Sequence, residues 1–341
     1  MFVEETLRSI ASASLKLATT VFTSGYRPSK QPTKTVAIVV PISNRPELTD
    51  DEQTSLNQLQ HFLGDYDKFL VAPRGLSFEL PNFTTLRFSP RFFGSPRANG
   101  RLLYRPEFYK RFLDYKYILI YHLDALVFTD DLMRWCATDI DYIGAPWIPF
   151  EEAPPWVTRH LLRGSNGKAK PVSEGGFSWV VEPRVGNGGL TLMKIASVLT
   201  VLRERYRKKP VDFFKEEAAN LIDEIRSSSV LKRLTRSEFF DGPLEDHQWL
   251  NRVDQNFPSN DQFWSFFATR YMPSFRIADW KTGLSFAFET APRQCFELNQ
   301  HKLPFGCHAW GKHDRDFWTA FLVGKDQQDT HSNPAADGHR K

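Results

Sequence analysis

The stretch Tyr117-Ile-Leu-Ile-Tyr-His-Leu-Asp124-Ala-Leu-Val-Phe128 is an apolar run that ends on one carboxylate and then resumes. Apolar runs bounded by polar residues are typical of a central strand in a sheet that is covered on both faces. A carboxylate buried at the end of such a strand is costly unless a cation or hydrogen-bond donors meet it. Ligand sites in open α/β sheets lie at the carboxyl ends of the strands. Asp124 is therefore the first candidate for chemistry.

Segments typical of strands and helices alternate around this stretch. Apolar runs predict strands, and a stripe of three leucines predicts a helix. Strands are expected over residues 35–42, 68–73, 84–88, 117–124, 141–147 and 186–193, and helices over 52–63 and 101–113. This alternation predicts an α/β fold, with a doubly wound, mixed but mostly parallel sheet flanked by helices.

The chain divides into three parts by composition. Residues 1–34 combine an amphipathic helix pattern with a linker rich in Ser, Gly, Pro and Lys. Residues 35–323 form the expected domain, with a basic helical insertion at about 196–258. A loop over 150–183 is expected to cover the site, and residues 324–341 have the composition of a disordered tail.

Charge and composition restrict the partners. A net charge of +4 without a concentrated basic face argues against nucleic-acid binding. Three cysteines without metal-ligand spacing suit a reducing cytoplasm, and no apolar run is long enough for a membrane span. The N-terminal helix is expected to dock on the domain or on a second subunit, with peripheral attachment at the inner face of the membrane as the alternative. The basic runs of the insertion fit a solvated helix face or contact with anionic lipid.

Four motifs carry residues suited to chemistry. The Asp124 segment resembles the metal-binding Asp-x-Asp of GT-A glycosyltransferases, with Leu126 at the second acidic position and His122 as a substitute ligand. Gly186-Asn187-Gly188-Gly189 resembles their acceptor-side segment, in which small residues let a sugar approach the backbone. Asn260-Asp261-Gln-Phe resembles the Glu-Asp-x-Phe motif of inverting enzymes. His308, between Gly306 and Trp310, is in the place of a late metal or diphosphate ligand.

The order of these motifs over residues 35–322 resembles a bacterial family catalogued as a domain of unknown function and regarded as GT-A-like. The resemblance implies an inverting, hexosyltransferase-like enzyme that uses a nucleotide-sugar donor, a glycan or lipid-linked acceptor, and Mn²⁺ or Mg²⁺. It implies a role in surface or capsular polysaccharide synthesis. It implies Asp261 as the general base, Asp124 and His308 as metal ligands, and a donor and substrate site formed by Pro41, Arg101, Asp124, Trp147, Asn187, Gly188, Gly189 and His308.

Two other interpretations stay open. Leu126 and Asn260 each stand where the resembled motifs have an acid, which favours a catalytically inactive protein that binds nucleotide sugars or glycans. The start of a helix also suits Asp261 as a capping residue. The N-terminal helix fits a scaffolding subunit that holds a partner enzyme.

Overall fold

The computed structural model describes residues 31–147, 184–186, 188–208 and 260–324. The predicted N-terminal helix, the loop over 150–183, Asn187, most of the helical insertion and nearly all of the tail lie outside these residues and stay predictions. In the ranges that are described, no helix combines the length and the apolar character needed to cross a membrane.

A six-stranded sheet in the order β3-β2-β1-β4-β9-β6 forms the centre of the molecule. The first four strands run parallel to one another, and β9 runs antiparallel to both β4 and β6. The predicted α/β class, with a mixed and mostly parallel sheet, is therefore confirmed. The strands are β1 (Lys34–Pro41), β2 (Lys68–Pro73), β3 (Phe83–Phe88), β4 (Tyr115–Tyr121), β6 (Tyr142–Gly144) and β9 (Leu190–Lys194).

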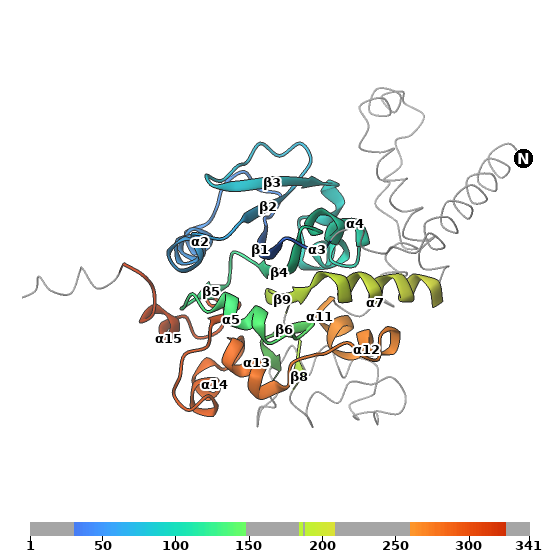
Figure 1. Cartoon of the computed structure of the whole chain (residues 1–341). Helices are drawn as coiled ribbons and strands as arrows, with labels where there is room; N and C mark the ends of the chain where they lie inside the picture. Colours follow the sequence, from blue (N-terminus) through green and yellow to red (C-terminus); the bar gives the residue numbers. More distant parts are fainter. Residues whose placement is uncertain (1–30, 148–183, 187, 209–259, 325–341) are drawn as a thin grey trace, which may run out of the picture.

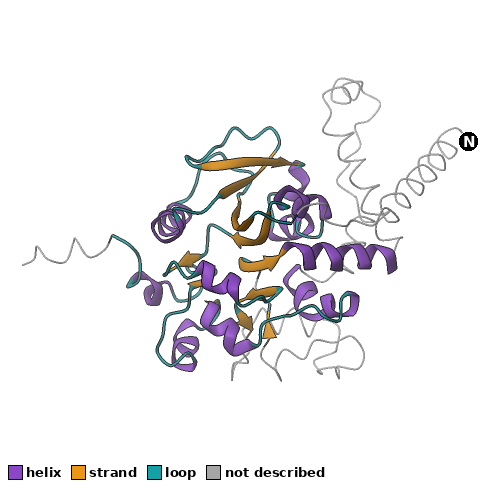
Figure 2. Ribbon diagram, viewed as in Figure 1, coloured by secondary structure: helices purple, strands orange, loops and turns teal. Residues whose placement is uncertain are grey.

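Helices flank the strands on both sides (Figures 1 and 2). In Figure 1, α2 is drawn to the left of β1 and β4, and α3, α4 and α7 to the right. The helices of this part are α2 (Asp50–Leu63), α3 (Pro96–Leu102), α4 (Pro106–Tyr109), α5 (Leu132–Ala137) and α7 (Ile195–Lys208), with short 3₁₀ turns η1 (Pro90–Phe92) and η2 (Lys110–Phe112).

The helix α2 shows how local sequence fixes an element. Thr49 accepts from the backbone N–H of Glu52, and the Glu52 carboxylate accepts from the Thr49 backbone, which forms a capping box. Three acidic residues in the first turn also favour a helix start at this point. Leu56, Leu59 and Leu63 bury the inner face, as their spacing predicts.

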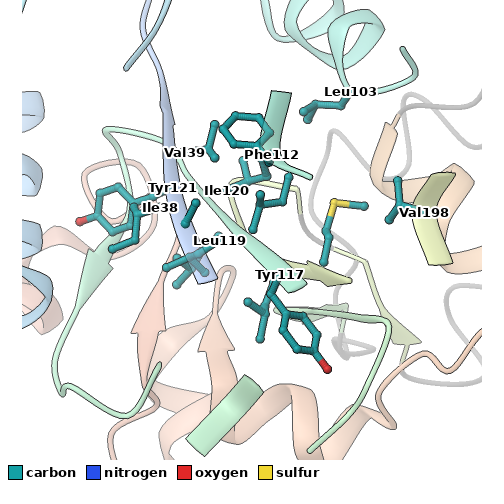
Figure 3. Packing of buried hydrophobic residues seen from close by; sticks show 14 of the residues in the cluster. Ile38, Val39, Leu103, Phe112, Tyr117, Leu119, Ile120, Tyr121 and Val198 are labelled. Atoms are coloured by element: carbon teal, nitrogen blue, oxygen red, sulfur yellow. The ribbon is translucent and has the colours of Figure 1, made fainter. Parts of the chain in front are cut away.

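The core lies between these layers, with β1 and β4 at its centre. Ile38 and Val39 of β1 and Leu119 and Ile120 of β4 are fully buried (Figure 3). Side chains on both faces of these strands are covered, which explains why their sequences read as continuous apolar runs rather than as alternations. Phe112 and Val198 reach the same cluster from η2 and α7.

The C-terminal segment adds a second, smaller layer around a three-stranded sheet ordered β10-β11-β5. Its apolar cluster surrounds Trp318, which stacks on Phe128 with ring centroids 5.4 Å apart. The elements are β5 (Leu126–Val127), β10 (Ala287–Phe288), β11 (Gly306–Cys307), α11 (Asn260–Gln262), the π-helical η4 (Phe263–Phe267), α12 (Ala268–Tyr271), α13 (Trp280–Phe286), α14 (Pro292–Leu298) and α15 (Arg315–Thr319). A separate two-stranded ribbon pairs β7 (Pro146–Trp147) with β8 (Arg184–Val185).

Two local predictions are wrong in detail. The single helix expected over 101–113 is divided into the end of α3, then α4 and η2, because Pro106 cannot continue a helix and disfavours helical backbone at Arg105. The strand expected over 141–147 is two short strands, β6 and β7, which pair with different partners.

Candidate metal centre and active site

The candidate site begins where β4 ends. β1 and β4 are parallel neighbours, and β1 is followed in the chain by strands on its other side, so the sheet reverses its strand order between them. Their register pairs Val39 with Ile120, which brings Pro41 level with His122. Crevices at such reversals are the usual ligand sites of open α/β sheets. His122 and Asp124 follow β4 directly and therefore lie at this crevice.

A buried hydrogen-bond network fixes the turn that carries Asp124. The backbone N–H of Ala125 donates to the carbonyl of His122 at 2.9 Å, which closes the turn. Ser55 of α2 donates to the Ala125 carbonyl at 2.6 Å, and the Tyr121 hydroxyl lies 2.9 Å from the same oxygen. Both side chains are buried, so α2 and β4 fix the position of this turn.

The register of two short strands delivers His308 to the same place. Antiparallel β5 and β11 pair Leu126 with Cys307, so His308 follows opposite Ala125. The His308 backbone donates to Phe288 at 2.9 Å, and the Trp310 backbone donates to the Asp124 carbonyl at 3.1 Å. Ala309 between them adopts a left-handed backbone with φ 54°, an unusual state for alanine that bends the chain around the site.

Three side chains converge here as possible ligands. His308 Nε2 lies 3.2 Å from Asp124 Oδ1, as predicted for two ligands of one ion. His122, Asp124 and His308 each offer one ligand atom, and these atoms lie within 4.8 Å of one another. The two imidazole rings are 5.9 Å apart between centroids and meet edge to face at 71°.

Glu289 supports the cluster from behind His308. It follows β10, and its Oε1 lies 3.3 Å from His308 Nδ1. A carboxylate on the outer nitrogen orients the ring and leaves the other nitrogen to face the site, as in many metal centres. Sequence reasoning missed Glu289, although Leu284-Ser-Phe-Ala-Phe-Glu289 has the same form as the Asp124 stretch: a mostly apolar run that ends on a carboxylate.

The charges in the cluster are unequal. Burial alone would lower the pKa of His308, but Asp124 and Glu289 outweigh it and raise that pKa to about 10. Burial would raise the pKa of Asp124, but its interactions with His308 dominate and hold it well below the usual carboxyl range. Burial lowers the pKa of His122 to about 4 against the opposing effect of Asp124. His122 is therefore a neutral imidazole at pH 7.

This set of groups fits a divalent cation. His122 and Asp124 supply a neutral nitrogen and an ionised oxygen, and His308, oriented by Glu289, supplies a second nitrogen once a metal ion displaces its proton. His122 Nε2 is buried and has no hydrogen-bond partner among the described residues, which leaves its lone pair or proton unmatched. A metal ion in the cluster would satisfy it.

Leu126, which stands at the second acidic position of the resembled motif, does not lie beside Asp124 and His308. Leu126 belongs to β5, is fully buried, and lies in the apolar cluster around Trp318 rather than at the crevice. His122, the predicted substitute ligand, lies beside Asp124 and His308 instead. The hydrogen bond from Ala125 to His122 turns the chain after β4, and this turn brings His122 and Asp124 together.

Gly188 and Gly189 lie between Asp261 and the group of His122, Asp124 and His308, named here the metal cluster. A Cβ on Gly189 would lie 1.9 Å from His308 Cδ2, so only glycine permits this position of the ring. A Cβ on Gly188 would meet Asn260 Nδ2 at 3.5 Å and Asp261 Cβ at 3.7 Å, which are ordinary contacts. Two adjacent glycines thus face His308 on one side and Asp261 on the other.

Asp261 lies in α11, immediately before the π-helical η4. π-Helical turns are frequent at functional sites because they re-aim the side chains of a helix. Its Oδ1 accepts from the backbone N–H of Gln262 at 3.0 Å, and neighbouring Asn260 accepts from Trp264 Nε1 at 2.8 Å. Burial and then Asp261 raise the pKa of Tyr142 in β6, so this carboxylate lies near the Tyr142 hydroxyl.

The remaining predicted site residues that the structure describes are Pro41, Arg101 and Trp147. Pro41 is the buried last residue of β1. Arg101 is exposed in α3, next to Gly100, where an added Cβ would lie 3.5 Å from that of Asn260. Trp147 is mostly buried, stacks on Phe266 at 5.8 Å and lies against Gly186, so protein atoms cover much of its ring.

The family model described as "Protein of unknown function (DUF5672)" matches residues 82–308. The chain belongs to this family. The matched range contains β4, all three members of the metal cluster, Glu289 and Asp261, whereas β1, α2 and β2 precede it. The predicted membership of a family catalogued as one of unknown function is thus confirmed. No curated protein matches the chain.

Solved structures similar to this DUF5672 member include three described as glycosyltransferases. One, involved in glycosylation of the major capsid of PBCV-1, has 9% identity and a TM-score of 0.40, covering 84% of this chain and 98% of its own. Galactosyltransferase LgtC, in complex with donor and acceptor sugar analogues, has 12% identity and a TM-score of 0.37, covering 84% and 96%. GlyE of Streptococcus pneumoniae TIGR4 has 12% identity and a TM-score of 0.38, covering 85% and 60%. Similarity at this level gives no information about activity.

Proposed function

We propose that this protein is a glycosyltransferase that moves a sugar from a nucleotide diphosphate donor to an acceptor hydroxyl. The observation that carries the proposal is the meeting of His122, Asp124 and His308 at the strand-order reversal, with Gly188 and Gly189 separating them from Asp261. A candidate cation site on one side of two adjacent glycines and a carboxylate on the other suit a reaction between an anionic leaving group and a neutral hydroxyl.

The proposed leaving group explains the role of the candidate cation site. A nucleoside diphosphate gains negative charge as the glycosidic bond breaks, and a bound divalent cation neutralises oxygens of that group. His122, Asp124 and His308 would hold this cation. Glu289 keeps His308 oriented through Nδ1, and Ser55 and Tyr121 hold the turn of Asp124, so the ligands are fixed before the sugar donor arrives.

Asp261 acts on the acceptor in this proposal. As the anomeric carbon is attacked, the acceptor hydroxyl loses a proton, and Asp261 is our general base for that proton. Base catalysis of this kind contributes about two to four powers of ten in rate. We infer an inverting reaction, since a single carboxylate suffices for it. Gly188 and Gly189 let the sugar approach the backbone beside this carboxylate.

The acceptor and the setting are finer parts of the proposal. A glycan or a lipid-linked acceptor fits a role in surface or capsular polysaccharide synthesis. A cytoplasmic location with peripheral membrane contact, or a homo-oligomer formed through the N-terminal helix, would suit such an acceptor. Each of these features depends on residues 1–30 and 209–259, which lie outside the described part of the chain.

The experiment is a screen of nucleotide sugars, first by thermal stabilisation and then by turnover with and without added divalent metal. A ligand at a hundredfold its dissociation constant adds about 2.7 kcal/mol to the free energy of unfolding, enough to detect. A sugar donor found in this way should be hydrolysed slowly and transferred to acceptors. If a nucleotide sugar stabilises the protein but is not turned over, with or without added metal, the result would instead favour the inactive binding protein.

The matched variant is Asp261→Asn, which keeps the size of the side chain but removes the proton acceptor. We expect transfer to fall by about two powers of ten or more while sugar-donor binding persists. The free energy of unfolding should change by less than about 1 kcal/mol. Transfer close to wild type would remove Asp261 from the mechanism, and a large loss of stability would show that its part is structural.

A further inference from the structure

The metal cluster has an unusual ligand composition for a site that would bind a diphosphate. Such sites commonly hold Mg²⁺ through carboxylates, because this hard cation prefers oxygen. Here two of the three side chains that converge are imidazoles and only Asp124 supplies oxygen. We propose that His122 makes this centre selective for nitrogen-preferring divalent metals, the class of Co²⁺ and Zn²⁺, over Mg²⁺, an inference that rests on the proposed function in taking this ion to be the cation of the transferase.

Hydrogen bonds hold the backbone of His122 in place, as expected for a metal ligand. Its backbone N–H donates to the Gly189 carbonyl at 2.8 Å, and its own carbonyl accepts from Ala125 at 2.9 Å, so the residue is fixed at both ends. Its Nε2 is buried without a hydrogen-bond partner among the described residues. A buried polar atom left unmatched is destabilising, and a metal ion bound at Nε2 would satisfy it.

His308 is arranged to match. Glu289 lies on its Nδ1 at 3.3 Å and leaves Nε2 to face Asp124 at 3.2 Å. The two rings stand edge to face, which separates them enough for both to contribute to one centre. Once a metal ion has displaced the proton of His308, two neutral nitrogens and one oxygen form a set that suits Zn²⁺, Co²⁺ or Fe²⁺ and satisfies Mg²⁺ poorly, since Mg²⁺ keeps oxygen ligands.

The ligand charge adds a second consequence. Asp124 is the charged ligand and Glu289 lies behind His308 at 3.3 Å, so these two carboxylates together balance the charge of a divalent ion. An acid in place of His122 would add a third negative charge and repel an anionic diphosphate. The present set therefore leaves more attraction for an anionic diphosphate, at the expense of affinity for hard cations.

The test measures metal binding directly, without any sugar donor. Metal-free full-length protein is titrated with Co²⁺ while the visible absorption bands of the bound ion are followed, and Zn²⁺ and Mg²⁺ are measured by competition. The wild type should bind Co²⁺ and Zn²⁺ more tightly than Mg²⁺ and show a Co²⁺ spectrum with nitrogen ligands. His122→Asp should lower the ratio of Co²⁺ to Mg²⁺ affinity by about tenfold or more.

Two further variants make the result specific. His122→Gln keeps a side chain of similar length without an imidazole, so Co²⁺ affinity should fall while the Mg²⁺ affinity stays weak. His301→Asp makes the same exchange at an exposed imidazole outside the cluster and should leave both affinities unchanged. The thermal midpoint of each metal-free variant shows that it is folded, and the wild-type affinities test the proposal even if a variant is not.

The outcomes separate this inference from the proposed function. Equal affinity of the wild type for Mg²⁺ and Co²⁺, or an unchanged affinity ratio in His122→Asp, would overturn the selectivity even if nucleotide sugars are turned over. Selective Co²⁺ and Zn²⁺ binding in a protein that turns over no nucleotide sugar would leave the selectivity standing and remove the transferase. Failure of the wild type to bind any of these metals at millimolar concentration would overturn the inference.

Discussion

Two clusters of ionisable side chains lie at opposite ends of the strand β4. At its amino end, Asp139 contacts Lys194 at 2.7 Å and Lys116 at 3.3 Å, and also pairs with Arg276. At its carboxyl end, Asp124 contacts His308 at 3.2 Å, with His122 nearby. Both clusters join segments that are far apart in the chain, and both hold the pKa of an aspartate well below the usual range.

The two clusters differ in how completely their polar atoms find hydrogen-bond or ion-pair partners. Asp139 has three cations around it, and the neighbouring Asp141 accepts from Ser197 at 2.6 Å and from the Arg276 backbone at 2.7 Å. The carboxyl-end cluster has a buried imidazole nitrogen without a hydrogen-bond partner among the described residues. A perturbed pKa alone does not distinguish the two clusters. Structural ion-pair networks perturb pKa values as functional sites do. The unmatched imidazole nitrogen is what favours a binding site at the carboxyl end and a structural network at the amino end.

The largest effect is expected from Asp124→Asn. The amide removes the one negatively charged ligand, so metal affinity should fall by more than the roughly 10- to 100-fold that loss of an outer partner costs. Isothermal titration of the metal-free variant with Co²⁺ measures this. The side chain is 54% exposed, so the free energy of unfolding should change by less than about 1 kcal/mol. Unchanged metal affinity would show that the cluster is not a cation site.

A somewhat smaller effect is expected from Gly189→Ala. The new methyl group would lie 1.9 Å from His308 Cδ2, so the ring must move away from Asp124. A displacement of about 1 Å in a site can reduce a rate by about a hundredfold, and we expect a loss of that order in sugar transfer, with weaker Co²⁺ binding. Overpacking should also destabilise the protein by about 1–3 kcal/mol, measured by chemical denaturation.

Gly188→Ala is the matched control for that substitution. Its Cβ would meet only ordinary contacts with Asn260 and Asp261, at 3.5 and 3.7 Å. Metal affinity and stability should therefore stay close to wild type, while transfer falls if the sugar approaches the backbone at Gly188. Equal loss of metal binding in both variants would argue against a specific contact between Gly189 and His308.

Glu289→Gln should have an intermediate effect on metal binding. Glutamine can still accept from His308 Nδ1 but lacks the charge, and loss of an outer-shell carboxylate typically costs about 10- to 100-fold in metal affinity. We expect about tenfold, at the lower end, because the contact is 3.3 Å long and a neutral acceptor remains. Glu297→Gln on the exposed face of α14 is the control. Equal Co²⁺ affinities in these two variants would leave Glu289 without a part in positioning His308.

Much of the parallel sheet could be predicted from the sequence, because strands covered on both faces are continuous apolar runs. The bounds of β2 were predicted to the residue, and those of β1 and β3 to within one. The helix α2 was placed almost as closely, since its leucine stripe is regular. Pro106 shows the limit: the apolar pattern continues across it, but the backbone does not.

Without the family resemblance, the apolar pattern alone predicts a site residue only where that residue ends an apolar run. Asp124 satisfies that rule, and so does Glu289, which was overlooked because β10 is only two residues long. The meeting of His308 with Asp124 depends on the pairing of β5 with β11, two-residue strands without a periodic signal. The choice between Leu126 and His122 depended on which residues face the crevice, and only the backbone course after β4 decides that.

The smallest effect is expected at the other end of β4, from Asp139→Asn. Asp139 has a left-handed backbone with φ 56°, which asparagine tolerates well, so the substitution tests the charge and little else. Its side chain is 47% exposed and its partners Lys116 and Arg276 are exposed as well, so solvent screens the interaction. We expect a loss of less than about 1 kcal/mol in the free energy of unfolding at pH 7, and no change in Co²⁺ affinity.

The sign of the pH dependence makes this small effect measurable. Hydrogen bonds from Lys194 and then Arg276 lower the pKa of Asp139 in the folded protein below its ordinary value of 3.8. A carboxyl group of this kind stabilises the fold above its ordinary pKa, and the contribution disappears as the pH falls through the lower pKa of the folded state. Urea unfolding of wild type and Asp139→Asn should therefore differ at pH 7 and converge as the pH falls below 3.8. A difference that persists or grows in acid would mean that Asp139 acts through something other than its charge, and the contrast between the two ends of β4 would lose its basis.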